Sequence, residues 1–212
     1  MGVNIEKLIS ISSNSFNQGQ VNLASGLLLV AGKLGKELEQ LLNKKDGFYA
    51  FESALRIFSS QASEYSYSLD QWNSPDLWRD HYAGLADDCV FFAEDIFGGQ
   101  FCIKDDAIHA FDPETGNLEA IAINLEAWAE EVLSDYNVWT GYPLANEWQK
   151  RHGALPYNQR LMPKTPFVCG GQFELDNLSL INVVSGMRSR ANLACQIADM
   201  PDGADIQFNI VE

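Results

Sequence analysis

Four short apolar segments follow one another between Val90 and Ile123, and a turn signal separates each from the next. These signals are Gly98-Gly99, Asp105-Asp106 and the run Asp112-Pro113-Glu114-Thr115-Gly116. Proline fixes one backbone dihedral angle and glycine accepts a positive φ, so such stretches reverse the chain. Connections this short join antiparallel neighbours. The spacing therefore predicts an antiparallel meander of four strands.

Helical patterns flank this meander on both sides. Leucines at helical spacing predict a helix over about 33–43, and the same spacing predicts a second short helical segment over 51–58. Ser74-Pro75-Asp76 has the composition of a helix start, and Asn124 is placed to cap another helix. Further helices are expected over 144–150 and 187–199, and further strands over 167–169, 172–175, 178–184 and 206–211.

Helices beside a largely antiparallel sheet place the chain in the α+β class. Its 212 residues are enough for one domain with a substantial core. Residues 1–32 are weakly patterned, so we expect an N-terminal arm or preamble there. A single domain is expected over 33–212, with a C-terminal extension that begins at about 140.

Acidic residues are concentrated in one quarter of the chain. The formal net charge is −15, and residues 85–135 contribute −12 of it through thirteen acidic residues and one lysine. A chain of this charge repels the phosphates of nucleic acid and attracts basic proteins. The acidic segment is therefore either a solubilising surface or a docking face for a cationic partner.

The cysteines and the apolar runs point to a soluble protein. Cys89, Cys102, Cys169 and Cys195 form no Cys-x-x-Cys pair, and we expect buried, reduced thiols, with disulfides left open. The longest apolar run, Leu23–Ala31, is too short to cross a bilayer, and the N-terminus lacks the pattern of a signal peptide. We expect a cytoplasmic protein with no membrane or nucleic-acid partner.

No motif for catalysis or metal binding is present in the sequence. His81, His109 and His152 are far apart and lack the spacing of metal ligands. Phosphate-binding, dinucleotide-binding and nucleophile-elbow signatures are absent as well. A catalytic pair of a cysteine with His81 would have to come from the fold. We expect no enzymatic activity, no cofactor and no metal.

Aromatic residues gather in a polar stretch just before the meander. Tyr65, Tyr67 and Trp72 follow no periodic face, so they either cover the core or anchor a partner beside the acidic segment. The candidate partner-binding residues are Trp72, Asp87, Asp88, Glu94, Asp95, Asp105 and Asp106.

Several stretches of the chain resemble the SUKH superfamily. They are 91–101 (strand, glycine turn, strand), 111–116 (hairpin) and 124–129 (a helix that opens with Asn-Leu-Glu). The turn Lys45-Asp46-Gly47-Phe48 is similar to the family's turn after its first helix, with Lys-Asp in place of Asn. Segments 166–171 and 201–204 resemble the C-terminal extension of bacterial members. The resemblance covers 33–135 well and 160–212 loosely.

The resemblance implies a SUKH-like α+β binding module with no catalytic motif to carry over. Bacterial members are commonly immunity proteins that neutralise a toxin, often a nuclease, and fungal members are regulatory scaffolds in cell-wall signalling. We therefore expect an immunity-type protein that neutralises a basic toxin through its acidic face. The alternatives are a regulatory scaffold without a toxin, or a ligand-binding protein or small enzyme that uses a pocket on the sheet.

Overall fold

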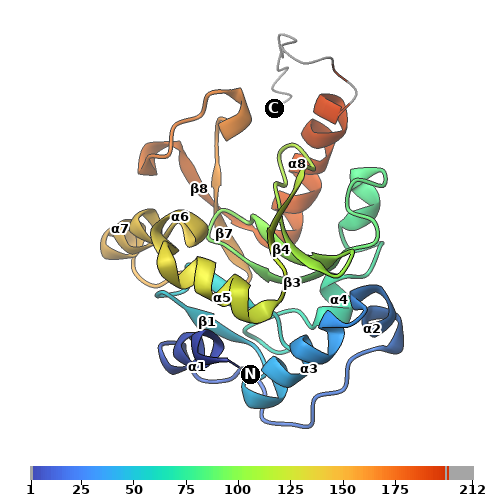
Figure 1. Cartoon of the computed structure of the whole chain (residues 1–212). Coiled ribbons are helices and arrows are strands. Elements are labelled where there is room, and N and C mark those ends of the chain that lie inside the picture. Colours follow the sequence, from blue (N-terminus) through green and yellow to red (C-terminus); the bar gives the residue numbers. More distant parts are fainter. Residues whose placement is uncertain (1, 199, 201–212) are drawn as a thin grey trace.

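Six strands form one antiparallel sheet in the computed structural model, which describes residues 2–198 and 200 (Figure 1). Each strand pairs with the next one along the chain, through short connections except between β2 and β3, which residues 58–89 separate. A separate antiparallel hairpin joins β7 to β8. The strands are β1 (Phe48–Ala50), β2 (Leu55–Ile57), β3 (Val90–Glu94), β4 (Gln100–Lys104), β5 (Ala107–Phe111), β6 (Leu118–Ala122), β7 (Gln159–Pro163) and β8 (Leu178–Asn182). The α+β class expected from the sequence is confirmed.

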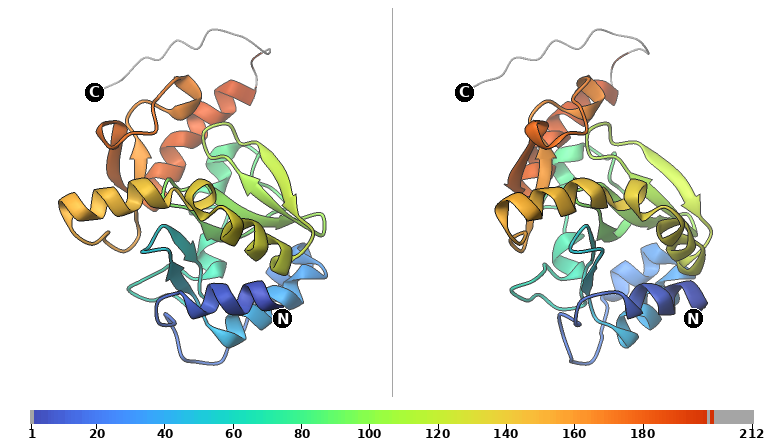
Figure 2. Two further views of the ribbon diagram at one scale, coloured as in Figure 1. Left: turned by 60° about the vertical axis from the view of Figure 1, so that its left-hand side comes forward. Right: turned by 90° about the vertical axis from the view of Figure 1, so that its left-hand side faces the viewer.

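Helices cover the sheet on both faces. α1 and α3 pack against α5 on one side, and α8 packs against η1 on the other (Figure 2). The α-helices are α1 (Val3–Ser10), α2 (Ser25–Ala31), α3 (Leu34–Lys44), α4 (Leu69–Trp72), α5 (Leu125–Ser134), α6 (Tyr136–Thr140), α7 (Tyr142–His152) and α8 (Val183–Ala198). Three short 3₁₀ turns are η1 (Arg79–Tyr82), η2 (Phe167–Cys169) and η3 (Leu175–Asn177).

Neighbouring aromatic residues on β3 build both faces of the core. Phe92 packs edge-on against Trp128 of α5, with ring centroids 5.0 Å apart. Phe91 points the other way and meets Trp78 at 5.0 Å. Successive strand residues alternate between faces, so one apolar run supplies two layers. Full burial of each such ring contributes about 1.5–3 kcal/mol.

The four-stranded meander predicted from turn signals is confirmed as β3–β6. The helix expected after Asn124 is also present, and the Asn124 Oδ1 accepts a hydrogen bond from the backbone N–H of Ala127 at 2.8 Å. The helices predicted over 33–43, 144–150 and 187–199 correspond to α3, α7 and α8. Local signals were sufficient for these elements: Asn124 caps α5, glycines bound α7, and α3 follows from the helical spacing of its leucines.

The helical segment predicted over 51–58 was wrong, because the chain forms the β1–β2 hairpin there. Phe51, Glu52 and Ser53 have φ values of 50°, 51° and 74°, and this left-handed run turns the chain back on itself. The apolar spacing fits a helix as well as two short buried strands. The pairing of β2 with β3 favours the strands over the helix. A local sequence pattern does not show which distant strand a segment pairs with.

Other expectations need smaller corrections. The stretch 1–32 holds two helices, and α1 docks on the core through buried Ile5 and Leu8. The helix predicted to begin at Ser74 is not formed, because the chain there leads only to the short 3₁₀ turn η1. Residues 167–169 form the 3₁₀ turn η2, and residues 172–175 form no strand. Strand β7 lies where no strand was predicted. The strand expected over 206–211 and the segment 201–204 lie outside the described residues.

A buried cluster of charges joins the β7–β8 hairpin to the main sheet. Glu94 ends β3, and its Oε1 lies 2.9 Å from Nη2 of Arg56 on β2 and 2.6 Å from Nε of Arg160 on β7. All three side chains are at most 1 % exposed. Asn158 accepts a further bond from Arg56 at 2.7 Å. Charges removed from water need partners, so these three residues hold β2, β3 and β7 in one arrangement.

Replacing the buried carboxylate should destabilise the protein strongly. Glu94→Gln leaves two buried guanidinium groups without a counter-charge, and we expect the free energy of unfolding to fall by about 3–5 kcal/mol. Urea unfolding followed by tryptophan fluorescence measures this loss. The control is Asp106→Asn, which removes an exposed pair with Lys33 and should cost at most about 1 kcal/mol. Equal losses in the two variants would contradict the role of the buried cluster.

Candidate functional site

The antiparallel order divides the predicted acidic residues between two ends of the meander. Glu94 lies opposite Gln100, and Gln100 lies opposite Phe111, so the β3–β4 and β5–β6 turns share one end. The β4–β5 turn and the entry to β3 share the other end. Asp95 lies at the first end. The second end carries the exposed residues Asp87, Asp88, Asp105 and Asp106.

Two of the predicted partner-binding residues are in the core instead. Trp72 has no exposed surface, stacks on Phe58 and donates its indole N–H to Gln100 Oε1 at 2.9 Å. Glu94 is equally buried in the arginine cluster. Neither side chain can contact a partner of the folded protein, so the structure removes both from the candidate surface. Residue type alone does not show whether a tryptophan or a glutamate faces inward.

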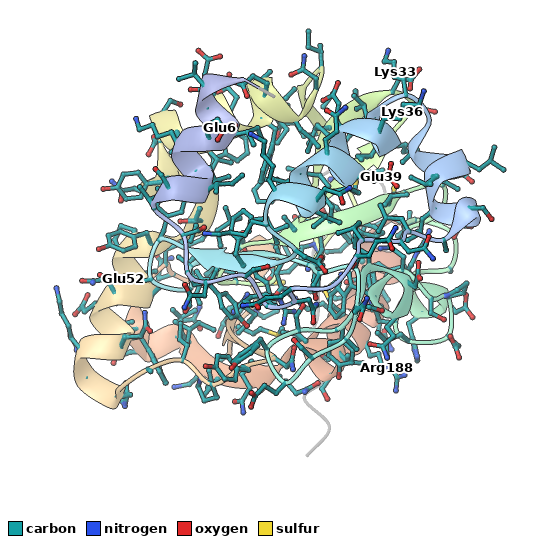
Figure 3. All side chains as sticks on the ribbon, turned by 90° about the horizontal axis from the view of Figure 1, so that it is seen from below. Glu6, Lys33, Lys36, Glu39, Glu52 and Arg188 are labelled. Atoms are coloured by element: carbon teal, nitrogen blue, oxygen red, sulfur yellow. The ribbon has the colours of Figure 1, made fainter. Side chains whose placement is uncertain are left out.

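Lysines offset part of the negative charge at the Asp105–Asp106 end. Lys33 lies 3.5 Å from the carboxylate of Asp106, and its backbone N–H donates to the same carboxylate at 3.2 Å. Figure 3 shows Lys33 and Lys36 together at the corner where α2 leads into α3. Lys104 also reaches this end, where its Nζ donates to the backbone carbonyl of Asp87 at 2.8 Å. This end therefore has a mixed charge.

The opposite end holds a cleft of about 600 Å³. Its walls come from the β3–β4 turn, the start of β4, the end of β5 with its following turn, α6, the region of η2, and α8. The aromatic lining residues are Phe97, Phe101, Phe111, Trp139, Phe167 and Phe173. The charged lining residues are Asp95, Asp112, Glu114, Glu119 and Arg190. Four carboxylates thus face one guanidinium among the described residues.

Glu114 is the most unusual of these carboxylates. It is only 3 % exposed, its Oε2 accepts the backbone N–H of Val168 at 2.9 Å, and its Oε1 has no hydrogen-bond partner within the described part of the chain. Burial raises the pKa of Glu114 above its ordinary value. Asp112 fixes its backbone by accepting the Glu114 N–H at 2.8 Å. The β5–β6 turn therefore presents a buried acceptor that still lacks a donor.

Asp95 shapes the neighbouring wall. Its Oδ1 accepts the backbone N–H groups of Phe97 and Gly99 at 2.7 and 2.8 Å, which closes the β3–β4 turn. Burial raises the pKa of Asp95 to about 7, although these two bonds and the nearby Arg190 favour the charged form. This carboxyl group therefore changes its charge close to neutral pH.

Arg190 brings the opposite charge from a distant part of the chain. It lies on α8, is 8 % exposed, and donates from Nη1 to the carbonyl of Phe97 at 2.8 Å and from Nε to the carbonyl of Gly186 at 3.2 Å. Backbone carbonyls thus occupy two of its five N–H donors. Sequence reasoning missed both Arg190 and Glu114: one is remote from the acidic segment, and the other belongs to a turn motif with an ordinary structural role.

Apolar side chains form an exposed rim beside these charges. Phe167 and Phe173 stack with their ring centroids 3.9 Å apart. Phe173 is 64 % exposed and Val138 is 72 % exposed, so both present apolar surface to solvent at the mouth of the cleft. Aromatic surface beside carboxylates can bind a group that is cationic at its tip and apolar along its stem.

The structure offers less chemistry elsewhere. His81 and Cys195 line a second pocket of about 400 Å³, but the Cys195 thiol donates to the backbone carbonyl of His81 at 3.5 Å rather than to its imidazole. No group of three potential metal ligands occurs within residues 2–198 and 200. Over the same residues, no helix has both the length and the apolar character needed to span a bilayer.

Comparison with known proteins supports the fold and leaves the function open. No family model matches the chain, and no curated protein matches it. Among solved structures, it is similar to that of Atu4351 from Agrobacterium tumefaciens, with a TM-score of 0.55 and 13 % sequence identity. The similarity covers 88 % of this chain and 87 % of Atu4351. At this level of identity, it shows that the two chains share a fold over most of their length.

The pKa of Asp95 gives the stability of the fold a specific pH dependence. The folded protein holds this proton up to about pH 7, whereas an unfolded aspartate releases it near pH ~3.9, so stability falls as the pH rises between these values. Asp95→Asn keeps the Oδ1 acceptor and removes the titration. We expect the melting temperature of this variant to fall less between pH 5 and pH 8 than that of the unmodified protein.

The matched control for this measurement is Asp105→Asn, which removes a carboxylate from an exposed turn. Its melting temperature should follow that of the unmodified protein across the same pH range. Parallel curves for all three proteins would show that Asp95 does not titrate near neutrality.

Proposed function

We propose that this protein is a non-enzymatic, immunity-type binding module that neutralises a basic toxin, with nucleases among the candidates. The resemblance of the sequence to the SUKH superfamily supports this proposal. The observation that carries it is the cleft at the end of the meander, where four carboxylates and one arginine surround an aromatic floor. A basic protein surface complements such a cleft in charge, and its apolar side chains complement the exposed rim.

Charge and apolar surface would act at different stages of binding. The net charge of −15 attracts a cationic protein over distances comparable to the Debye length, about 8 Å at physiological salt. Once the partner is close, Phe173 and Val138 supply apolar contact area that water leaves on binding. The proposal therefore combines fast, salt-dependent association with short-range anchoring in the cleft.

A pull-down from lysate of the source cells, at low and high salt, tests the proposal. We expect one basic protein to be retained at low salt and released at high salt, and this protein should lose its toxic activity when mixed with the purified chain. A retained partner without toxic activity would favour a regulatory scaffold. Binding whose association rate does not depend on salt would contradict the electrostatic part of the proposal.

Two charge reversals show which end of the meander the partner contacts. Glu119→Lys changes the charge at the cleft, and Asp87→Lys makes the same change at the opposite end. We expect the Glu119 variant to associate with the partner about tenfold or more slowly, and the Asp87 variant to lose much less. Stopped-flow fluorescence with the purified partner measures both rates. A larger loss for Asp87→Lys would place the contact at the Asp105–Asp106 end.

The dimensions of the cleft also favour a second candidate, a small-ligand-binding protein. Its volume of ≈ 600 Å³ lies within the range of about 300–1,000 Å³ that is typical of ligand sites. Glu114 and Asp95 supply convergent polar groups above an apolar floor. Native mass spectrometry of the protein purified from its source would reveal a retained small molecule, and its loss in Glu114→Gln would assign it to the cleft.

A further inference from the structure

We infer that the cleft is an anchor pocket for one arginine side chain of the protein partner, with Glu114 as the receiving carboxylate. This inference rests on the proposed function for the source of the arginine, which belongs to the basic partner. The pocket itself can be tested without that partner.

The lining residues offer acceptors that require a donor. Oε1 of Glu114 is buried without a hydrogen-bond partner among the described residues, and a buried acceptor left unpaired is costly. Asp95 uses Oδ1 for both of its backbone bonds, which leaves Oδ2 as a second acceptor at the same cleft. Both acceptors line the same cleft, and a cationic group with several N–H donors would supply the donor that Glu114 lacks.

The single base of the cleft argues against an anionic occupant. Three of the five N–H donors of Arg190 are directed at the carbonyls of Phe97 and Gly186 and at the Met187 sulfur, so a guanidinium with few remaining donors is the single base of the lining. An anion would gain little from this arginine and would meet four carboxylates. A cation is opposed by one guanidinium and attracted by those four groups, so the lining as a whole favours positive charge.

The aromatic rim favours arginine over lysine. Phe167 and Phe173 stack face to face, with ring centroids 3.9 Å apart and 8° between their planes, so the stack offers one outer ring face, and Phe173 is its exposed member at 64 %. A planar guanidinium stacks on such a ring face and is less strongly hydrated than an ammonium group. Its fork of donors can also reach two separate carboxylates, which a compact ammonium group does less well.

The η2 turn borders the receiving carboxylate. Oε1 of Glu114 is buried, so the inference requires the adjoining wall to shift before a guanidinium can reach this oxygen. Val168 contacts Glu114 directly. Its backbone N–H donates to Glu114 Oε2, and its side chain is 40 % exposed. The backbone amide of Val168 is therefore the natural reporter of binding at this site.

Titration with a small probe tests the pocket. The probe is N-acetyl-arginine-methylamide, and its neutral isostere is the corresponding citrulline derivative. Binding is followed at pH 8 through the Val168 amide and the Trp139 indole in two-dimensional ¹H–¹⁵N spectra of the full chain. We expect both signals to shift with the arginine probe and not with citrulline. A lysine derivative should bind more weakly, and Glu114→Gln should weaken arginine binding about tenfold or more.

The control variant is Glu130→Gln, which removes the same charge from the exposed face of α5, away from the cleft. It should bind the arginine probe with unchanged affinity, and both variants should melt cooperatively. Equal shifts with arginine and citrulline, equal binding of lysine, or equal weakening in both variants would overturn the inference. If the unmodified protein does not bind the arginine probe but still binds a basic partner in a salt-dependent way, this pocket is refuted and the proposed function stands. If the protein binds the arginine probe but the pull-down retains no basic partner, the pocket is supported and the proposed function is contradicted.

Discussion

A single carboxylate buried between two guanidinium groups holds the two parts of the fold in register. Glu94 meets Arg56 within the main sheet and Arg160 from the later hairpin. Three charges without access to water stay in place only while their mutual geometry is kept. Gln100 extends the cluster, because it donates to Glu94 at 3.2 Å and accepts from Trp72 at 2.9 Å. The start of β4, which is also the floor of the cleft, is thereby fixed from both sides.

The cleft begins at the next residue along the chain. Glu94 faces the interior at the last residue of β3, while the half-buried Asp95 lies beyond the strand and closes the loop that leads into β4. Two consecutive carboxylates therefore have different roles, one in joining the elements and one in shaping the wall of the cleft. The end of the strand explains this separation, because a strand positions Glu94 and a turn positions Asp95.

Local signals predicted the centre of the fold and little of the candidate site. The meander and the cap at Asn124 follow from turn and capping preferences that act over a few residues. The β1–β2 hairpin depends on pairing with β3, and β7 depends on a salt bridge to Glu94, so neither is visible in a short window. The cleft likewise combines local and distant residues. Its acidic turn is visible in the sequence, but Phe167 and Arg190 come from segments that only the tertiary fold brings to it. Whether an acidic residue is buried depends on such distant partners, and the sequence alone therefore does not distinguish the buried Glu94 from the exposed acidic residues.

The arginine–glutamate–arginine cluster also bears on how this chain can diverge. A change at Arg56, Glu94 or Arg160 alone leaves an uncompensated charge in the core, whereas joint replacement by apolar residues of similar volume can be tolerated. Descendants of a common ancestor should therefore keep all three residues or exchange them as a set. Such a linked triplet is therefore a better mark of common descent than any single position.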